Sequence, residues 1–119
     1  MSQLIVRPSV LAGEVEAPSS KSYTHRLLSV ALLADGESKI RKPLLSSDTH
    51  ATINAVENLG GQVSNSEDSL VVSGTGGEIR PRKKEINVQN SGTTLRLMSA
   101  ISALSPERVL LTGDESILK

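Results

Sequence analysis

The sequence predicts an α/β (alpha+beta) fold built from βαβαββ units, with one complete unit followed by part of a second. Two observations lead to this prediction. Short strand-like segments alternate along the chain with three helical segments that carry apolar residues, a pattern typical of helices packed on sheets. The segment around Arg26 also matches, without gaps, the segment around Arg96, which lies 70 residues later. Such an offset indicates a repeated supersecondary unit whose copies bury their apolar faces against one another.

Strands are expected where short runs of apolar and β-branched residues are bounded by turn residues. The strand expected at residues 13–17 ends at Pro18. A hairpin is expected to turn at residues 66–68. A polar loop is expected at residues 74–84. The expected strands are residues 4–6, 13–17, 38–41, 62–65, 69–73, 85–89 and 108–112.

Helices are expected after small polar residues that can accept hydrogen bonds from the first-turn backbone. The expected helices run from Ser20 or Ser22 to about Ala34, from the cap at residues 46–48 to the glycines at 60–61, and from about Gly92 to Leu104. The first helix is apolar on most sides, which predicts that it is well buried. Residues 114–116 resemble another helix start, so we expect the chain to be the front piece of a longer protein.

The composition favours a small-molecule site over a nucleic-acid or membrane surface. The 119 residues carry 13 basic and 13 acidic side chains, so no general charge draws the chain to nucleic acid or to a membrane. Tyr23 is the only aromatic residue, although aromatic stacking is the usual way to hold single-stranded bases. The sequence has no cysteine, no long apolar run and no recognisable leader, which favours a cytoplasmic protein without disulfides.

The two matching segments each combine a helix start with an arginine one turn further on. In the first, a Ser-Lys-Ser run at residues 20–22 precedes Arg26; in the second, a Ser-Gly-Thr run at residues 91–93 precedes Arg96. A helix start offers free backbone N–H groups and a partial positive charge, and arginine adds a planar fork that fits phosphate or carboxylate oxygens. Two such segments predict a substrate with more than one anionic group.

Four motifs, in this order, resemble the N-terminal part of the EPSP synthases, the 3-phosphoshikimate 1-carboxyvinyltransferase family. They are PSSKSYTHR at residues 18–26, LLSSD at 44–48, NSGTTLR at 90–96 and LTGD at 111–114. The resemblance covers essentially the whole chain but only the front part of the family's length. It implies an enolpyruvyl-transferase-like inside-out α/β barrel, in which each of two domains is built from βαβαββ units.

The resemblance also implies an activity. Members of the family are transferases that move the enolpyruvyl group of phosphoenolpyruvate to the 5-hydroxyl of shikimate 3-phosphate, on the pathway to chorismate and the aromatic amino acids. They need no metal or organic cofactor. The resemblance further implies that residues 1–17 form strands that pack with the other, missing domain, and that residues 18–119 form an incomplete substrate domain. The main acid and base carboxylates belong to later segments, so the chain alone is expected to be inactive without the missing C-terminal part.

The same resemblance assigns roles to six residues. Lys21 would be the catalytic residue, in contact with both substrates. Shikimate 3-phosphate would be held by Lys21, Ser22 and Arg26, and phosphoenolpyruvate by Lys21, Gly92, Asn90 and Thr93. Ser22 and Arg26 are four residues apart and share a helix face, while Gly92 leaves no side chain between the backbone and the smaller anion.

The sequence departs from the family's usual residues at three places near these motifs. Ser19 stands where glycine is usual, His25 where asparagine is usual, and residues 94–97 where the run is often Ala-Met-Arg-Pro. None of these changes removes a charged ligand. His25 and His50 lack the spaced partners of a metal site, so both are interpreted as ordinary residues.

Two charged residues near the motifs have structural interpretations. Asp48 is interpreted as a cap or first-turn acid that could also orient Lys21. Arg96 is interpreted as a brace of its own loop through an ion pair, in preference to a ligand contact. The glycines at residues 74–77 are interpreted as a turn, and the basic residues at 80–84 as a solvated loop.

Two other functions stay open at this point. One is that of the related transferase family that acts on UDP-N-acetylglucosamine, although that family typically has Lys-Asn at the first motif, where this chain has Lys21 followed by Ser22. The other is a phosphate-binding module of the same repeat type that has no catalytic activity.

Overall fold

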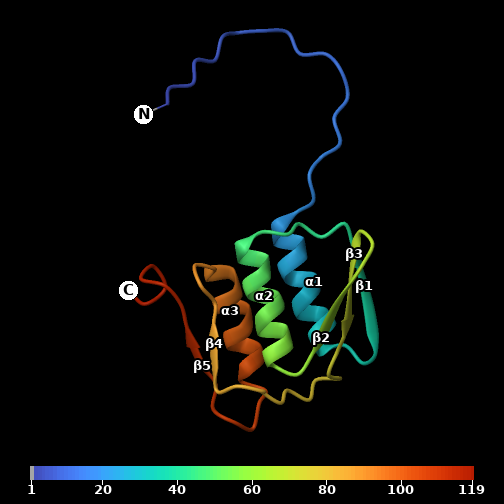
Figure 1. Ribbon diagram of the computed structural model, residues 1–119, viewed down its shortest axis with the longest axis vertical. Helices are drawn as coiled ribbons and strands as arrows, with labels where there is room; N and C mark the ends of the chain where they lie inside the picture. Colours follow the sequence, from blue (N-terminus) through green and yellow to red (C-terminus); the bar gives the residue numbers. More distant parts are fainter. Residues whose placement is uncertain (1) are drawn as a thin grey trace.

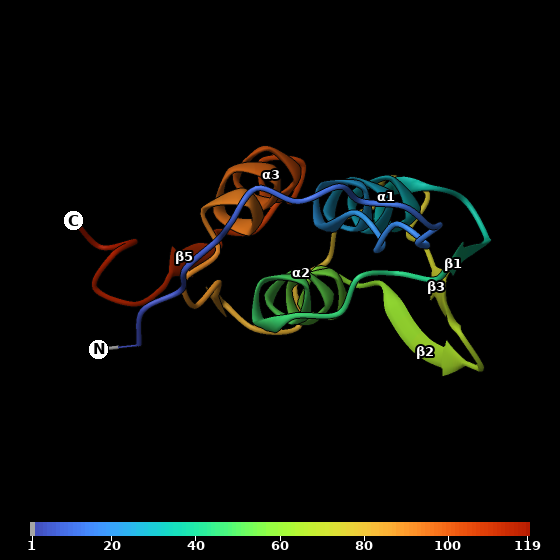
Figure 2. The ribbon, with the colours of Figure 1, turned by 90° about the horizontal axis from the view of Figure 1, so that it is seen from above.

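The computed structural model describes residues 2–119, in which three helices lie between two small sheets (Figure 1). The helices are α1 (Lys21–Leu33), α2 (Ser47–Asn58) and α3 (Gly92–Ser102). Each helix contacts the other two, and the view from above shows α2 facing both α1 and α3 (Figure 2). All three helices begin at the same end of the molecule, so their N-termini lie together (Figure 1).

Serine residues cap all three helices, and the sequence predicts such a cap for the first two. Ser20, rather than Ser22, caps α1, and its hydroxyl accepts a hydrogen bond from the Tyr23 backbone at 3.2 Å. Ser46 caps α2 in a reciprocal pair with Thr49, and Ser91 caps α3. Each cap satisfies a first-turn N–H that has no partner inside the helix.

The larger sheet contains three antiparallel strands in the order β1-β3-β2. They are β1 (Glu37–Arg41), β2 (Gln62–Ser66) and β3 (Ser69–Ser73). Strands β2 and β3 form the expected hairpin, whose turn is at Glu67 and Asp68. The smaller sheet pairs β4 (Glu85–Asn87) with β5 (Leu110–Thr112) in parallel, and α3 forms the crossover between these two strands.

The core is aliphatic, as a chain with a single aromatic residue requires. Fully buried side chains from all three helices meet those of the sheets and of the loop at residues 74–84, and the largest of them are Leu28, Leu32, Val56, Leu59, Val72, Ile79, Val88 and Met98. Ile79 lies in the loop at residues 74–84 that the sequence predicts to be polar, and its burial attaches that loop to the core. The helix N-termini also carry buried polar side chains, among them His25, Thr49 and Thr94.

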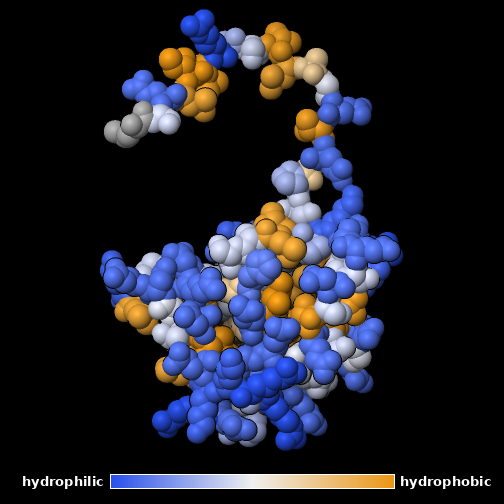
Figure 3. All heavy atoms as spheres, in the orientation of Figure 1, coloured by the Kyte–Doolittle hydropathy of each residue, from blue (hydrophilic) through white to orange (hydrophobic). Residues whose placement is uncertain are grey.

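The N-terminal segment is the main correction to the expected elements. Residues 2–20 form no strand, and the segment extends away from the helices (Figures 1 and 3). Its apolar side chains are exposed, with Leu4 at 90%, Val10 at 97% and Val15 at 95%. A strand needs a neighbour for its backbone N–H and C=O groups, and nothing in residues 2–119 offers one at this position. The predicted packing of this segment with another domain stays a prediction.

Three other elements are shorter than expected. β4 ends at Asn87, the last residue that pairs with β5, and Gln89 further on has a φ of 54° in the left-handed region, which does not belong to a strand. β5 begins at Leu110, since only residues 110–112 pair with β4, and α3 ends at Ser102. At the C-terminus, Asp114 accepts a hydrogen bond from the Ser116 backbone at 2.9 Å and forms a single turn in place of the expected helix.

Candidate functional site

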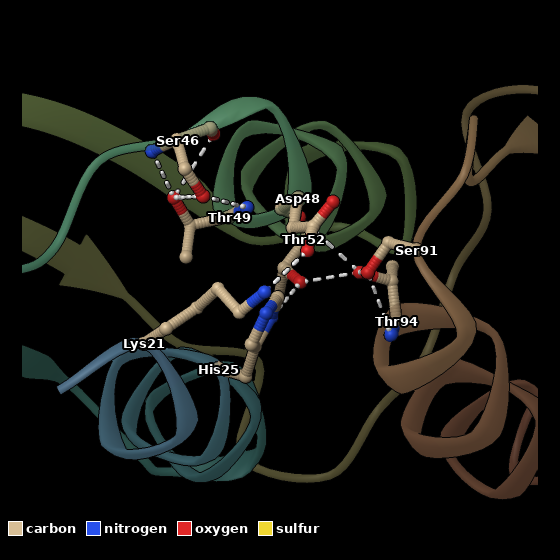
Figure 4. Close-up of polar contacts among 8 residues, drawn as sticks. All are labelled: Lys21, His25, Ser46, Asp48, Thr49, Thr52, Ser91 and Thr94. Atoms are coloured by element: carbon tan, nitrogen blue, oxygen red, sulfur yellow. Dashed lines mark hydrogen bonds and ion pairs between the residues drawn. The ribbon is translucent and has the colours of Figure 1, made fainter. Parts of the chain in front are cut away.

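The predicted site residues lie at the shared N-terminal end of the helices. Lys21 is the first residue of α1, Gly92 is the first residue of α3, and Asp48 of α2 contacts residues of both neighbouring helices (Figure 4). Free N–H groups and the positive ends of three helix dipoles therefore point to one region. Such a region favours anions, and it needs no excess of basic residues over the chain as a whole.

Lys21 is held by an ion pair across the first two helices. Its Nζ lies 2.7 Å from the Asp48 Oδ2, and the two side chains are 51% and 28% exposed. The pair is open to solvent, so we assign it a positioning role and little stability. The expectation that Asp48 orients Lys21 agrees with this geometry, and Asp48 also lies in the first turn of α2, where an acid is favoured.

Ser22 and Arg26 lie one helical turn apart on the exposed side of α1. Within residues 2–119, neither side chain makes a hydrogen bond or an ion pair. The five donors of the Arg26 guanidinium are thus free to meet an anion, and Ser22 can add a hydroxyl beside them.

The start of α3 is tied to the end of β5. The Asn90 side-chain amide donates a hydrogen bond to the Asp114 carboxylate at 2.8 Å, and the Asp114 backbone donates to the Gln89 carbonyl at 2.8 Å. The Ser116 hydroxyl and then the Asn90 amide lower the pKa of Asp114, because both donate to its charged form. Asn90 therefore fixes the shape of the loop before Gly92, and Thr93 is exposed beside it.

Arg96 braces this loop by a hydrogen bond and not by the expected ion pair. Its Nη1 donates to the Gly92 carbonyl at 3.1 Å, and the part of the chain that is described offers it no acidic partner. A Cβ atom on Gly92 would lie 2.9 Å from this nitrogen, so the glycine leaves room for the brace. The bond runs from residue i to the carbonyl of residue i−4 on the same helix, which explains why no distant acid is needed.

His25 was expected to be an ordinary residue, but its side chain is one end of a buried polar network. Its side chain is buried, and its Nδ1 lies 2.7 Å from the Thr52 hydroxyl (Figure 4). Thr52 in turn lies 2.7 Å from the hydroxyl of Thr94. One signal in the sequence could have indicated this: His25 follows Lys21 by four residues, so both face α2.

The environment of His25 favours the neutral imidazole. Burial, which disfavours the charged form, lowers the pKa of His25 from its usual 6.5, and the positive charge of Lys21 acts in the same direction. The negative charge of Asp48 opposes both but does not outweigh the burial. In its neutral form the imidazole adds no charge beside the Lys21–Asp48 pair.

The described residues contain no cluster of three or more His, Cys, Asp or Glu side chains placed to bind a metal ion. No helix within residues 2–119 is both long and apolar enough to cross a membrane.

Comparison with known proteins gives one consistent result. The family model described as "EPSP synthase (3-phosphoshikimate 1-carboxyvinyltransferase)" matches residues 5–119. A 3-phosphoshikimate 1-carboxyvinyltransferase from Methanococcoides burtonii is 49% identical over 115 residues, which are 97% of this chain and 27% of that protein. The protein of the same name from Aeropyrum pernix is 48% identical over 115 residues, again 97% of this chain and 26% of that protein.

Solved structures agree with the sequence comparisons. An EPSP synthase from Acinetobacter baumannii matches 87% of this chain with a TM-score of 0.78 and 26% sequence identity, and the match covers 24% of that chain. The present chain thus spans about a quarter of the length of the relatives that it matches.

Proposed function

The chain belongs to the EPSP synthase family, and on that premise we propose that it is the N-terminal part of a 3-phosphoshikimate 1-carboxyvinyltransferase. The 5-hydroxyl of shikimate 3-phosphate adds across the C2=C3 bond of phosphoenolpyruvate, with its oxygen bonding to C2 and a proton going to C3. The tetrahedral adduct then loses phosphate from C2 and a proton from C3, which restores the double bond. Both substrates are anionic. The observation that carries the proposal is the pairing of two anion-suited helix starts, one on α1 and one on α3, with Lys21 and Asp48 linking the first two helices.

The start of α1 is suited to shikimate 3-phosphate. The unpaired Arg26 guanidinium and the Ser22 hydroxyl lie on one exposed helix face, where a phosphate can accept hydrogen bonds from both. The helix dipole adds to the attraction at this end. We therefore propose that Ser22 and Arg26 hold the phosphate of this substrate.

Lys21 is suited to contact both substrates. Its ammonium group lies at the start of α1, and Asp48 draws it toward α2 and so toward the α3 side of the site. A lysine beside two anions lowers the repulsion between them, which is necessary before their reacting atoms can meet. We propose that Lys21 is the catalytic residue of this segment, and that Asp48 keeps it in place.

The start of α3 is suited to phosphoenolpyruvate. Gly92 offers a helix start without a side chain, and Asn90 fixes the loop before it through Asp114. Thr93 is exposed at the second position of the helix. We propose that the smaller anion binds here, against the Gly92 backbone, with Asn90 and Thr93 shaping the loop.

The rest of the catalytic apparatus is proposed to come from chain beyond these residues. The apolar side chains of residues 2–17 are exposed, and we propose that they pack with another domain of the complete enzyme, while residues 18–119 form part of the substrate domain. On this proposal the isolated chain does not turn over substrate.

A chimeric enzyme tests the proposal. Residues 5–119 of this chain would replace the matching part of the Methanococcoides burtonii relative, and phosphate release would be measured with phosphoenolpyruvate and either shikimate 3-phosphate or UDP-N-acetylglucosamine. We expect release with shikimate 3-phosphate alone. Release with the UDP-sugar, or a folded chimera without any turnover, would contradict the proposal.

A further inference from the structure

A buried chain of hydrogen bonds joins the starts of all three helices (Figure 4). It runs from His25 on α1 through Thr52 on α2 to Thr94 and Ser91 on α3, and each step is 2.7 Å long. The four residues are between 0% and 2% exposed. Nothing in the proposed roles of the substrate ligands requires these side chains, so their arrangement needs its own explanation.

The same chain is connected to the substrate motifs at both ends. The Thr94 hydroxyl donates to the Asp48 carbonyl at 3.4 Å, and the Asp48 carboxylate holds Lys21 at 2.7 Å. On the other side, Ser91 caps α3 and directly precedes Gly92. Hydrogen bonds therefore connect Lys21 through Asp48 and the buried network to Ser91, and Ser91 is covalently joined to Gly92.

We propose that His25, Thr52 and Thr94 are positioning residues that hold the Lys21 end of α1 and the Gly92 end of α3 at one fixed spacing. The inference rests on the proposed function, because it concerns the spacing between the two substrate motifs. Thr52 contacts both His25 and Thr94, so the three side chains form one connected unit across the three helices.

The hydrogen positions follow from the donors and acceptors present. His25 Nε2 is buried without a partner in residues 2–119, and buried N–H groups are rarely left unpaired, so the proton belongs on Nδ1. Nδ1 then donates to Thr52, Thr52 donates to Thr94, and Thr94 donates to the Asp48 carbonyl. Ser91 can donate to Thr94, and every hydroxyl hydrogen in the network has an acceptor.

Short hydrogen bonds in a region of low dielectric constant are strong, and a network of them rigidifies the elements that it joins. Two substrates that react with each other are sensitive to such rigidity, since a displacement of about 1 Å can lower a rate by about 100-fold. Loss of the network should therefore lower kcat and raise KM for phosphoenolpyruvate, although the residues that contact the substrates remain.

The test uses the chimeric enzyme with two substitutions of the central residue. Thr52→Val keeps the shape of the side chain and removes both hydrogen bonds, whereas Thr52→Ser keeps the hydroxyl and removes a methyl group. We expect Thr52→Val to lower kcat/KM for phosphoenolpyruvate by at least about fivefold. Thr52→Ser should retain more activity than Thr52→Val. Ser29→Ala is the matched control, since this buried hydroxyl bonds only to the His25 carbonyl of its own helix.

Three outcomes would overturn the proposal. Thr52→Val could behave like Ser29→Ala, or Thr52→Ser could be the more damaging change, which would mean that packing and not hydrogen bonding matters. The third concerns the tautomer, which nitrogen NMR of the 119-residue chain reads without any turnover. We expect a neutral imidazole with its proton on Nδ1, and a proton on Nε2 would contradict the network. An inactive unsubstituted chimera would refute the proposed function alone and leave the tautomer test to decide this one.

Discussion

The Arg26 side chain has no partner in the described part of the fold that would give it a structural role. It is exposed, and in residues 2–119 it has neither an ion-pair partner nor a hydrogen bond. An exposed charged side chain without a partner adds little to the stability of the fold, and it is free to bind an anion. The same reasoning does not apply to Arg96, because its guanidinium donates a hydrogen bond to the Gly92 carbonyl.

Replacing Arg26 by alanine should therefore separate binding from stability. In the chimeric enzyme, Arg26→Ala should weaken binding of shikimate 3-phosphate by about 1.5–3 kcal/mol, the range for a hydrogen bond to a charged group. The free energy of unfolding of the isolated chain should stay unchanged in urea titrations. Arg80→Ala, which removes a guanidinium paired with Glu78 in a distant loop, is the control. Unchanged affinity after Arg26→Ala would remove this residue from the proposed site.

His25 predicts a pH dependence of stability. Its pKa is lowered in the folded chain, mainly by burial, so below pH 6.5 the unfolded chain binds more protons than the folded one. The free energy of unfolding is therefore highest above pH 6.5, where His25 is neutral in both states. It decreases as the pH falls from 6.5 through the lowered pKa of the folded chain. Urea titrations at a series of pH values should show this decline. His25→Asn should flatten it, whereas His50→Asn, at an exposed position, should leave it in place.

At the scale of the element, the start of α3 combines two demands on one glycine. Gly92 leaves room for the Arg96 brace, and on the proposed function it also leaves room for phosphoenolpyruvate. A methyl group at residue 92 would disturb the Arg96 brace only slightly, because the end of an arginine side chain can move aside. It would disturb phosphoenolpyruvate strongly, because an anion bound against the backbone has no room to move.

Gly92→Ala should separate these demands. Alanine has the better helix propensity, by about 1 kcal/mol, so the free energy of unfolding of the isolated chain should not fall. In the chimeric enzyme the added methyl group should raise KM for phosphoenolpyruvate and leave KM for shikimate 3-phosphate nearly unchanged. Equal effects on both substrates, or none on either, would show that phosphoenolpyruvate does not lie against this backbone.

The elements also show what the sequence can predict. Serine caps, paired glycines and short β-branched runs are local signals, and they located α1, α2, the β2–β3 hairpin and the start of α3. Strands at residues 4–6 and 13–17 could not be decided locally, because a strand depends on a neighbour that can lie far along the chain. The His25 network was missed for the same reason: its bonds join residues 27 and 42 positions apart.

For the whole molecule, the exposed N-terminal segment is the feature that a domain on its own does not explain. Leu4, Val10 and Val15 present apolar surface, and the only ion pair of the segment within residues 2–119 joins Glu16 to Lys42 at 3.0 Å. Exposed apolar surface of this kind indicates a partner surface elsewhere.

Removing residues 2–17 should therefore have opposite consequences in two settings. The isolated chain should lose less than about 1 kcal/mol of unfolding free energy, the worth of one exposed ion pair. The chimeric enzyme should lose soluble, folded protein, because the segment is proposed to pack with the other domain there. Urea titration and the yield of folded enzyme measure the two effects. A large loss in the isolated chain would mean that the segment supports this domain instead.

The central claim is that the start of α1 holds the phosphate of shikimate 3-phosphate. A crystal structure of the chimeric enzyme with this substrate tests it most directly. The account predicts the phosphate oxygens within hydrogen-bond distance of Ser22 and Arg26, with Lys21 still beside Asp48 or turned to the substrates. A bound substrate whose phosphate lies away from both Ser22 and Arg26 would contradict the account.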